Sequence, residues 1–276
     1  MILSKVVEHL ESIAPIESAL EDDIVGLIIG NLGKEIRGIG VSWALTPYVL
    51  SEAGIKEKKI MGEEDAKIKR KKEEKIDLFV VHEYPFFERQ NTSLLALFED
   101  IANFKRIKPI VREDISLYVM HSNLDETEGG TADIIAKSIG MKVTEKIKCG
   151  RIGEIPEMNF ENLVSSFKTV FVADALRSAG RLPGNKIKRV GIYVGKGLGN
   201  IETIEKFYLK NCDVFVSYGL TKEAAQYANE IGMQLLELDP TKVERSVMQN
   251  LAEKLQIDLR DVTTIYYDCE DIISYV

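Results

Sequence analysis

Short apolar runs alternate along the chain with segments in which apolar residues recur at every third or fourth position. The runs are rich in Val, Ile, Leu and Phe, which is typical of buried strands, whereas the recurring spacing is typical of helices that bury one face. The predicted strands are 25–30, 38–45, 75–81, 117–120, 142–148, 188–194, 212–217, 233–238 and 263–267. The predicted helices are 2–13, 47–54, 92–104, 131–139, 159–168, 221–231 and two that begin at 201 and at 239–241. Strands that alternate with helices predict an α/β protein with mostly parallel sheets.

Residues that begin or break helices predict the limits of the elements in the middle of the chain. The segment 121–130 is polar and ends in two glycines, so we expect a loop there. Thr131 is expected to cap the next helix, and Gly140 to lie just past its end. The segment 151–156 is expected to form a turn.

Glycine-rich breaks around residue 129 and at 180–184 divide the pattern into two similar halves. We expect two α/β domains packed against each other, and a length of 276 residues with 45% hydrophobic content is sufficient for both. The first domain is predicted to be discontinuous, comprising residues 1–128 and 236–276. The second is predicted to comprise residues 129–235.

Composition excludes several classes of protein. A formal net charge of −8 argues against specific nucleic-acid binding, because proteins that bind nucleic acids electrostatically carry a basic face. The three cysteines, 149, 212 and 269, are far apart and favour neither a disulfide framework nor a cysteine metal site. The N-terminal residues lack the order of a signal peptide, and no apolar run is long enough to span a bilayer. We therefore expect a cytoplasmic protein without a membrane partner.

Two of the three histidines stand directly after predicted buried strands. His82 is followed by Glu83, and His121 is followed four positions later by Asp125. If the two strands are parallel neighbours, these four side chains emerge at the same edge of one sheet, where α/β proteins bind ligands. Imidazoles with adjacent carboxylates are natural ligands of a divalent cation. The alternative is that each histidine only closes a strand and bonds to a nearby carbonyl, and the sequence leaves both interpretations open.

A glycine-rich segment at 195–200 follows another predicted strand and precedes a helix. This order is found where backbone amides cradle a phosphate. The segment lacks both the last glycine of the dinucleotide fingerprint and the Lys-Ser/Thr of a P-loop. A tight turn is the simpler interpretation.

Five segments of the chain resemble the NGG-interacting-factor-three-like family, whose bacterial members are called type 2 homologues of GTP cyclohydrolase I. They are IAPIESALEDDIVGLIIG, IDLFVVHEYPFF, ISLYVMHSNLDETEGGTADIIAKSIG, GRIGEIPEMNFENLV and VGIYVGKGLGN. The third is the most specific, because its histidine, its aspartate and its glycine pair fall where the family has a His-x-x-x-Asp ligand pair. The resemblance implies two α/β domains with a two-metal site in the cleft between them, usually within a ring-shaped hexamer.

The resemblance also implies a set of metal ligands. His82 corresponds to the first histidine of the family's His-His pair, His121 and Asp125 to the middle pair, and Glu244 to the C-terminal bridging glutamate. Three positions depart from the family pattern. Glu83 stands where the second histidine is expected, Pro240 where a histidine precedes the bridging glutamate by four residues, and Ala44 where the first domain has an aspartate.

These departures leave two hypotheses about function. If Glu83, with Asp239, replaces the missing imidazoles, the site is rich in oxygen ligands and its preference moves from Zn toward Mn, Fe or Mg, with one or two ions per chain. The protein is then a metal-dependent hydrolase acting on a nucleotide or a similar small molecule. The alternative is a non-catalytic oligomeric binding or scaffold protein with a degenerate metal site. No residue is identified as a general base.

Overall fold

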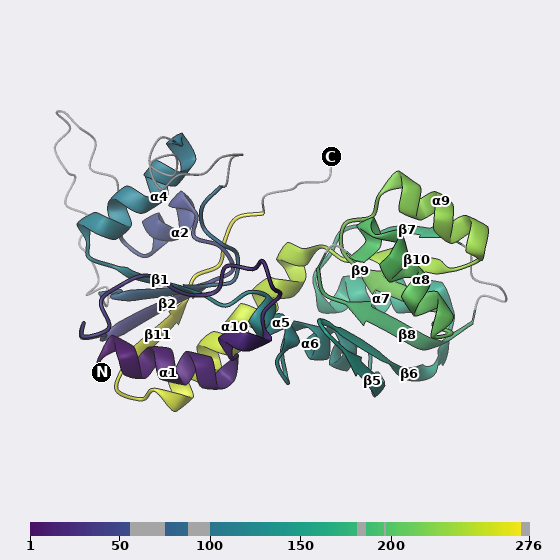
Figure 1. Ribbon diagram of the computed structural model, residues 1–276, viewed down its shortest axis with the longest axis horizontal. Coiled ribbons are helices and arrows are strands. Elements are labelled where there is room, and N and C mark those ends of the chain that lie inside the picture. The colour runs from purple at the N-terminus through teal and green to yellow at the C-terminus, as the bar shows by residue number, and fades with distance from the viewer. Residues whose placement is uncertain (56–74, 88–99, 181–185, 196, 272–276) are drawn as a thin grey trace. The chain divides into compact units, whose positions relative to one another are not determined.

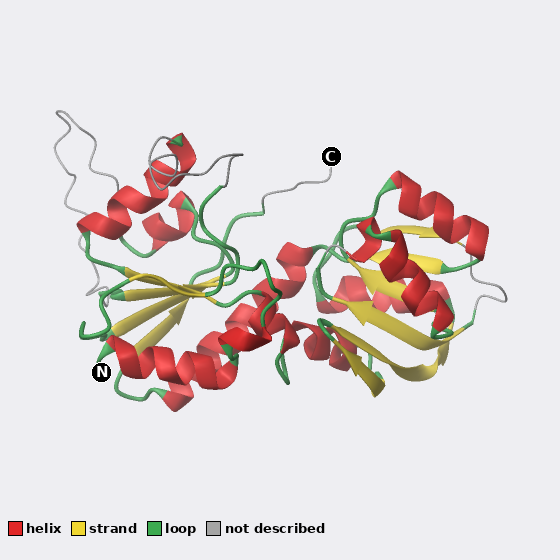
Figure 2. Ribbon diagram, in the orientation of Figure 1, coloured by secondary structure: helices red, strands yellow, loops and turns green. Residues whose placement is uncertain are grey.

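The computed structural model describes residues 1–55, 75–87, 100–180, 186–195 and 197–271, which belong to two units (Figure 1). The first unit holds residues 1–123 and 248–272, and the second holds residues 124–247 and 273–276. Among the described residues, each unit has one β-sheet with helices packed on it (Figure 2). The predicted α/β class is therefore confirmed. The predicted domain limits at residues 128 and 236 stay a prediction.

The sheet of the first unit has the strand order β1-β4-β3-β2-β11 over the described residues. Strands β4, β3, β2 and β11 are parallel, and β1 joins the edge antiparallel to β4. The strands are β1 (Gly26–Ile29), β2 (Gly38–Ser42), β3 (Leu78–Val81), β4 (Ser116–Val119) and β11 (Thr263–Tyr266). This sheet is mostly parallel, as predicted.

Helices cover both faces of the first sheet. Helix α1 (Leu3–Ile13) lies on one face, and α2 (Pro47–Glu52) and α4 (Ile101–Arg112) lie on the other (Figure 1). A short 3-10 helix, η1 (Ile16–Ser18), follows α1. Helix α2 begins as predicted, because the hydroxyl of Thr46 accepts a hydrogen bond from the Val49 amide at 3.1 Å.

Helix α4 begins at Ile101. Its cap is Asp100, whose carboxylate accepts hydrogen bonds from the amides of Ala102 and Asn103 at 2.9 and 3.0 Å. Most of the predicted helix at 92–104 lies outside the described residues.

The sheet of the second unit has the strand order β5-β6-β8-β9-β10-β7 over the described residues. The strands are β5 (Lys142–Ile147), β6 (Gly150–Met158), β7 (Arg177–Gly180), β8 (Ile187–Tyr193), β9 (Val214–Ser217) and β10 (Gln234–Glu237). Only the central strands β8, β9 and β10 are parallel. The prediction of a mostly parallel sheet is wrong here, because only two residues separate β5 from β6 and so short a connection can join only antiparallel strands.

The segment 151–156, predicted as a turn, is part of strand β6. Gly153 permits the close approach of β5, since a Cβ there would lie 2.3 Å from a carbonyl oxygen of that strand. Pro156 falls in the stretch between Glu154 and Met158 where the pairing with β8 is irregular. A proline fits into a strand at such an interruption because it has no amide hydrogen to donate.

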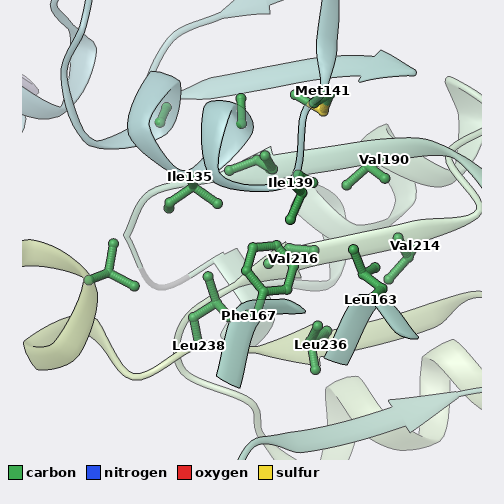
Figure 3. Packing of buried hydrophobic residues seen from close by; sticks show 14 of the residues in the cluster. Ile135, Ile139, Met141, Leu163, Phe167, Val190, Val214, Val216, Leu236 and Leu238 are labelled. Carbon is green, nitrogen blue, oxygen red and sulfur yellow. The ribbon is translucent and has the colours of Figure 1, made fainter. Parts of the chain in front are cut away.

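Alternating side chains of the second sheet build two hydrophobic cores. Val214 and Val216 pack with helices α6 (Thr131–Ser138) and α7 (Phe160–Val170). Phe215 between them packs with α8 (Ile201–Leu209) and α9 (Lys222–Ile231). Figure 3 shows the first of these cores, where Phe167 and Leu163 of α7 meet the valines of the sheet. Helices α5 (Ser122–Glu126) and α10 (Pro240–Asp258) each contain residues of both units.

The region around α5 and α6 differs from the sequence prediction in two ways. The expected loop contains the helix α5, and Gly130 rather than Thr131 is the cap of α6. Gly130 has no room for a side chain, because a Cβ there would lie 1.9 Å from the carbonyl oxygen of Leu124. Gly140 lies past the end of α6 with a φ of +64°, as predicted.

A buried arginine ties β6 to these helices. Arg151 is 1% exposed, and its guanidinium donates to the carboxylate of Asp133 on α6, with Nε 2.5 Å from Oδ1. The same group donates to the carbonyl oxygens of Gly150 at 2.8 Å and of Glu126 at 3.3 Å. The end of α5, the start of α6 and β6 are therefore held by one side chain.

We expect Asp133→Ala to lower the free energy of unfolding by about 3 kcal/mol or more, because the change leaves the Arg151 charge buried without its partner. Burial by itself would raise the pKa of Asp133, but hydrogen bonds from Arg151 and from the Gly129 amide hold it below the usual 3.8. As the pH falls toward 3.8, the unfolded chain therefore binds more protons than the folded protein. The stabilisation by Asp133 is present above about pH 4 and is lost as the pH falls through the folded-state pKa.

Urea unfolding between pH 3 and pH 7 measures both effects. The matched control is Glu157→Ala, which breaks the ion pair between Glu157 and Lys186. These side chains are 54% and 72% exposed, so the free energy of unfolding should be nearly unchanged. Equal losses in the two variants would contradict the role given to Arg151.

Candidate metal centre

The ends of two neighbouring strands bring two histidines together. Strands β3 and β4 are parallel and paired in register, with Val81 opposite Val119. The amide of Met120 donates to the carbonyl of Val81 at 2.9 Å and so continues the pairing. His82 directly follows β3, and His121 follows β4 after Met120. Both imidazoles therefore emerge at the carboxyl edge of the first sheet, where ligands bind in α/β folds.

The backbone after strand β2 places the adjacent glutamate. The carbonyl oxygen of Trp43 accepts hydrogen bonds from the amides of both His82 and Glu83, at 3.0 and 2.9 Å. This fixes the backbone of the two residues against a third strand end. The carboxylate of Glu83 thereby reaches the same edge as the imidazoles.

His82, Glu83 and His121 form a cluster with metal-ligand chemistry. Each offers one ligand atom within 4.8 Å of the others. The two imidazoles meet edge to face, with ring centroids 4.9 Å apart and an interplanar angle of 88°. Metal bonds of about 2.1 Å put neighbouring donors about 3–4 Å apart, so small rotations of these side chains would suit an ion. The donor set fits a divalent cation such as Zn, Mn or Fe.

A carboxylate that sequence reasoning did not select orients one of the imidazoles. Nδ1 of His121 lies 2.8 Å from Oδ1 and 3.0 Å from Oδ2 of Asp23, a residue between η1 and β1. Burial by itself would raise the pKa of Asp23, but the hydrogen bonds from His121 and Ser122 outweigh it and hold the pKa far below the usual range. The acidic run at 21–23 was the only sequence signal for this residue.

Hydrogen bonds around the start of α5 hold Asp23 in place. The amide of Ser122 donates to Oδ2 of Asp23 at 3.0 Å, and the Ser122 hydroxyl donates to the same oxygen. That hydroxyl also accepts from the Leu20 amide at 2.9 Å. Asn123 accepts from the His121 amide at 3.0 Å and donates to the carbonyl of Ala14 at 2.8 Å. The segment from 14 to 23 is thus fastened to the strand end that carries His121.

The other two predicted ligands, Asp125 and Glu244, belong to the second unit. Asp125 lies on α5 and is 5% exposed, and Glu244 lies on α10 and is 4% exposed. Both act on the buried hydroxyl of Tyr218: burial raises the pKa of this group well above its usual value, and the two carboxylates raise it further. Tyr218 follows strand β9 and was not singled out from the sequence.

Asp239 and Pro240 have local roles at the start of α10. Oδ1 of Asp239 accepts a hydrogen bond from the Thr241 amide at 2.9 Å. Pro240 is the first residue of the helix, a position that suits proline because its missing amide hydrogen is not needed there.

The glycine-rich segment favours the tight turn over the phosphate cradle. Gly197–Gly199 forms the short helix η3, and a Cβ at Gly197 would lie 2.6 Å from the hydroxyl oxygen of Ser217. The side chain of Asn200 accepts from the Thr203 amide at 2.9 Å and so caps α8 itself. The glycines serve close packing against β9.

In the part of the chain that is described, every helix is too short or too polar to cross a bilayer.

Comparison with known proteins places the chain in a family. Residues 1–60 and 64–271 match the family model described as Duf34/NIF3 (NGG1p interacting factor 3). A protein of Streptococcus pneumoniae serotype 4 called GTP cyclohydrolase 1 type 2 homolog is 28% identical over 254 residues, which cover 87% of this chain and 84% of that protein.

Two solved structures show a similar fold. Reduced HcgD from Methanocaldococcus jannaschii has a TM-score of 0.75 at 22% identity, with 98% of each chain covered. A Bacillus cereus protein related to NIF3 has a TM-score of 0.77 at 17% identity, with 100% of this chain and 99% of that one covered. With the family model matched along almost the whole sequence, the chain belongs to the Duf34/NIF3 family.

Proposed function

We propose that this chain is a divalent-metal-binding protein whose ligands include His82, Glu83 and His121. The observation that carries the proposal is the cluster of their ligand atoms, all within 4.8 Å of one another. The Asp23 carboxylate on Nδ1 of His121 supports it, because histidines that ligate metals usually donate their other ring nitrogen to such a group. Asp125 and Glu244 are further ligands in this proposal.

The composition of the cluster bears on which metal is bound. With Glu83 in place of a histidine, carboxylate oxygens form a larger share of the five proposed ligands than imidazole nitrogens. Oxygen ligands favour Mn, Mg or Fe, whereas imidazoles favour Zn. We therefore expect Mn or Fe to compete well with Zn, at one or two ions per chain.

The proposed reaction is hydrolysis of a nucleotide or a similar small molecule. It rests on the names of the relatives, which are called GTP cyclohydrolase 1 type 2 homologs. A bound divalent ion supplies a polarised substrate oxygen or an activated water. The chain's own residues bind the ion, orient His121 through Asp23 and hold Glu83 through the Trp43 carbonyl. A homo-oligomer, expected to be a hexamer, is part of the same proposal.

The metal content of the protein, purified without chelator and measured by elemental analysis, tests the proposal. We expect one or two Mn, Fe or Zn ions per chain, with His121→Ala and Glu83→Gln weakening the affinity at least about tenfold. Asp125→Asn and Glu244→Gln should also lower the number of ions per chain. His9→Ala is the matched control, because His9 lies on α1 and bonds to Asp258 at 3.1 Å. Absence of metal after reconstitution with Mn, Zn and Fe would overturn the proposal.

Turnover of nucleotides separates the enzyme from a non-catalytic binding protein. We expect the metal-loaded protein to convert GTP or a related nucleotide, with product detected by chromatography, and His121→Ala to abolish the conversion while circular dichroism stays unchanged. Full metal content without turnover of any nucleotide would favour the binding or scaffold alternative. Pro240 at the position of a family histidine is the feature that favours that alternative.

A further inference from the structure

Both oxygens of the Asp23 carboxylate lie near Nδ1 of His121, Oδ1 at 2.8 Å and Oδ2 at 3.0 Å, but they differ in their other hydrogen bonds. Oδ2 accepts two hydrogen bonds from Ser122, one from its amide at 3.0 Å and one from its hydroxyl. Oδ1 is the nearer oxygen to Nδ1 of His121, at 2.8 Å. The Ser122 amide can only donate, and the Ser122 hydroxyl uses its oxygen to accept from Leu20 and its hydrogen to reach Asp23. An acceptor is therefore required at the Oδ2 position.

This arrangement dictates where the proton of a neutral His121 ring resides. An ionised carboxylate has no hydrogen to donate, so a hydrogen bond between Asp23 and Nδ1 requires the proton to be on Nδ1. The lone pair is then on Nε2, the ring nitrogen through which His121 would bind a metal ion. The carboxylate is well placed for this, since its side chain is only 15% exposed and is fixed by Ser122.

We propose that Asp23 is a positioning residue that sets the tautomer of His121 and so presents the unprotonated Nε2 to the metal. The tautomer of His121 exists whether or not a metal binds. Only the presentation of Nε2 to a metal rests on the proposed function. The same carboxylate ties the 14–23 segment to the ligand-bearing strand end, so the position of the ring is set by groups far away in the sequence.

The geometry predicts an unusual order of effects for two substitutions. In Asp23→Asn, the two donors of Ser122 require the amide oxygen at the Oδ2 position, which puts the amide nitrogen at the Oδ1 position. That nitrogen donates to Nδ1 of His121, and the proton moves to Nε2, where it blocks metal binding. In Asp23→Ala the carboxylate that requires the proton on Nδ1 is absent, and no amide nitrogen takes its place. The nearly isosteric Asn variant should therefore bind metal more weakly than the truncated Ala variant.

Two measurements on the full chain test this. The first is ¹⁵N NMR of the histidine rings in metal-free protein at pH 8, where three histidines make assignment feasible through His9→Ala and His82→Ala. The second is titration calorimetry with Zn²⁺ and Mn²⁺. We expect the Nδ1-protonated ring of His121 in the wild type, the Nε2-protonated ring in Asp23→Asn and a mixture in Asp23→Ala. The dissociation constant should rise about tenfold in Asp23→Ala and about a hundredfold in Asp23→Asn.

A second His–Asp pair in the chain provides the matched control. His9 and Asp258 are 3.1 Å apart, and both side chains are about one-quarter exposed. Asp258→Asn should change neither metal affinity nor the tautomer of His121. A purely structural role for Asp23 would make Asp23→Ala at least as damaging as Asp23→Asn, and that order would overturn the inference, as would an unchanged His121 tautomer in Asp23→Asn. A wild-type protein that binds no metal while Asp23→Asn inverts the tautomer would overturn the proposed function and support the role of Asp23.

Discussion

The parallel pairing of β3 with β4 is the constraint on which the candidate site depends. Val81 lies opposite Val119, and a shift of one residue would turn every side chain of one strand to the other face of the sheet. Both strands are buried, so the apolar core selects this register. The two imidazoles are adjacent because hydrophobic burial aligns the strands that precede them.

Polar groups at the strand ends convert that alignment into a defined cluster. The carbonyl of Trp43 holds the backbone of His82 and Glu83, and the carboxylate of Asp23 holds the ring of His121. Each of these bonds joins segments that are far apart in the sequence: Trp43 follows β2 and bonds to residues after β3, whereas Asp23 precedes β1 and bonds to a residue after β4. Partly buried polar groups that are mutually satisfied in this way limit the orientations open to the ligand side chains.

In the second unit, a buried ion pair holds the helix that carries a proposed ligand, whereas in the first unit strand register places the histidines. Arg151 on β6 gathers Asp133 and two backbone carbonyls, and this fixes the helices α5 and α6 on the mixed sheet. Asp125 is part of α5, so its position within the unit depends on this arginine. The cost of burying a guanidinium is offset only because nearly all of its donors have partners.

The sequence by itself determined the α/β class, most of the strands and the two histidines at strand ends, because apolar runs and their abrupt ends are local features. Glu83 was also visible, as a carboxylate beside one of these histidines. Tertiary structure alone decided the role of Asp23, whose partner His121 lies 98 residues away and whose sequence context is an ordinary acidic turn. It also made 151–156 a strand, since that outcome depends on pairing with β5 and β8 and on a partner for Arg151. Local patterns cannot encode which distant backbone or side chain satisfies a hydrogen bond, and the fold settles this by bringing the partners together.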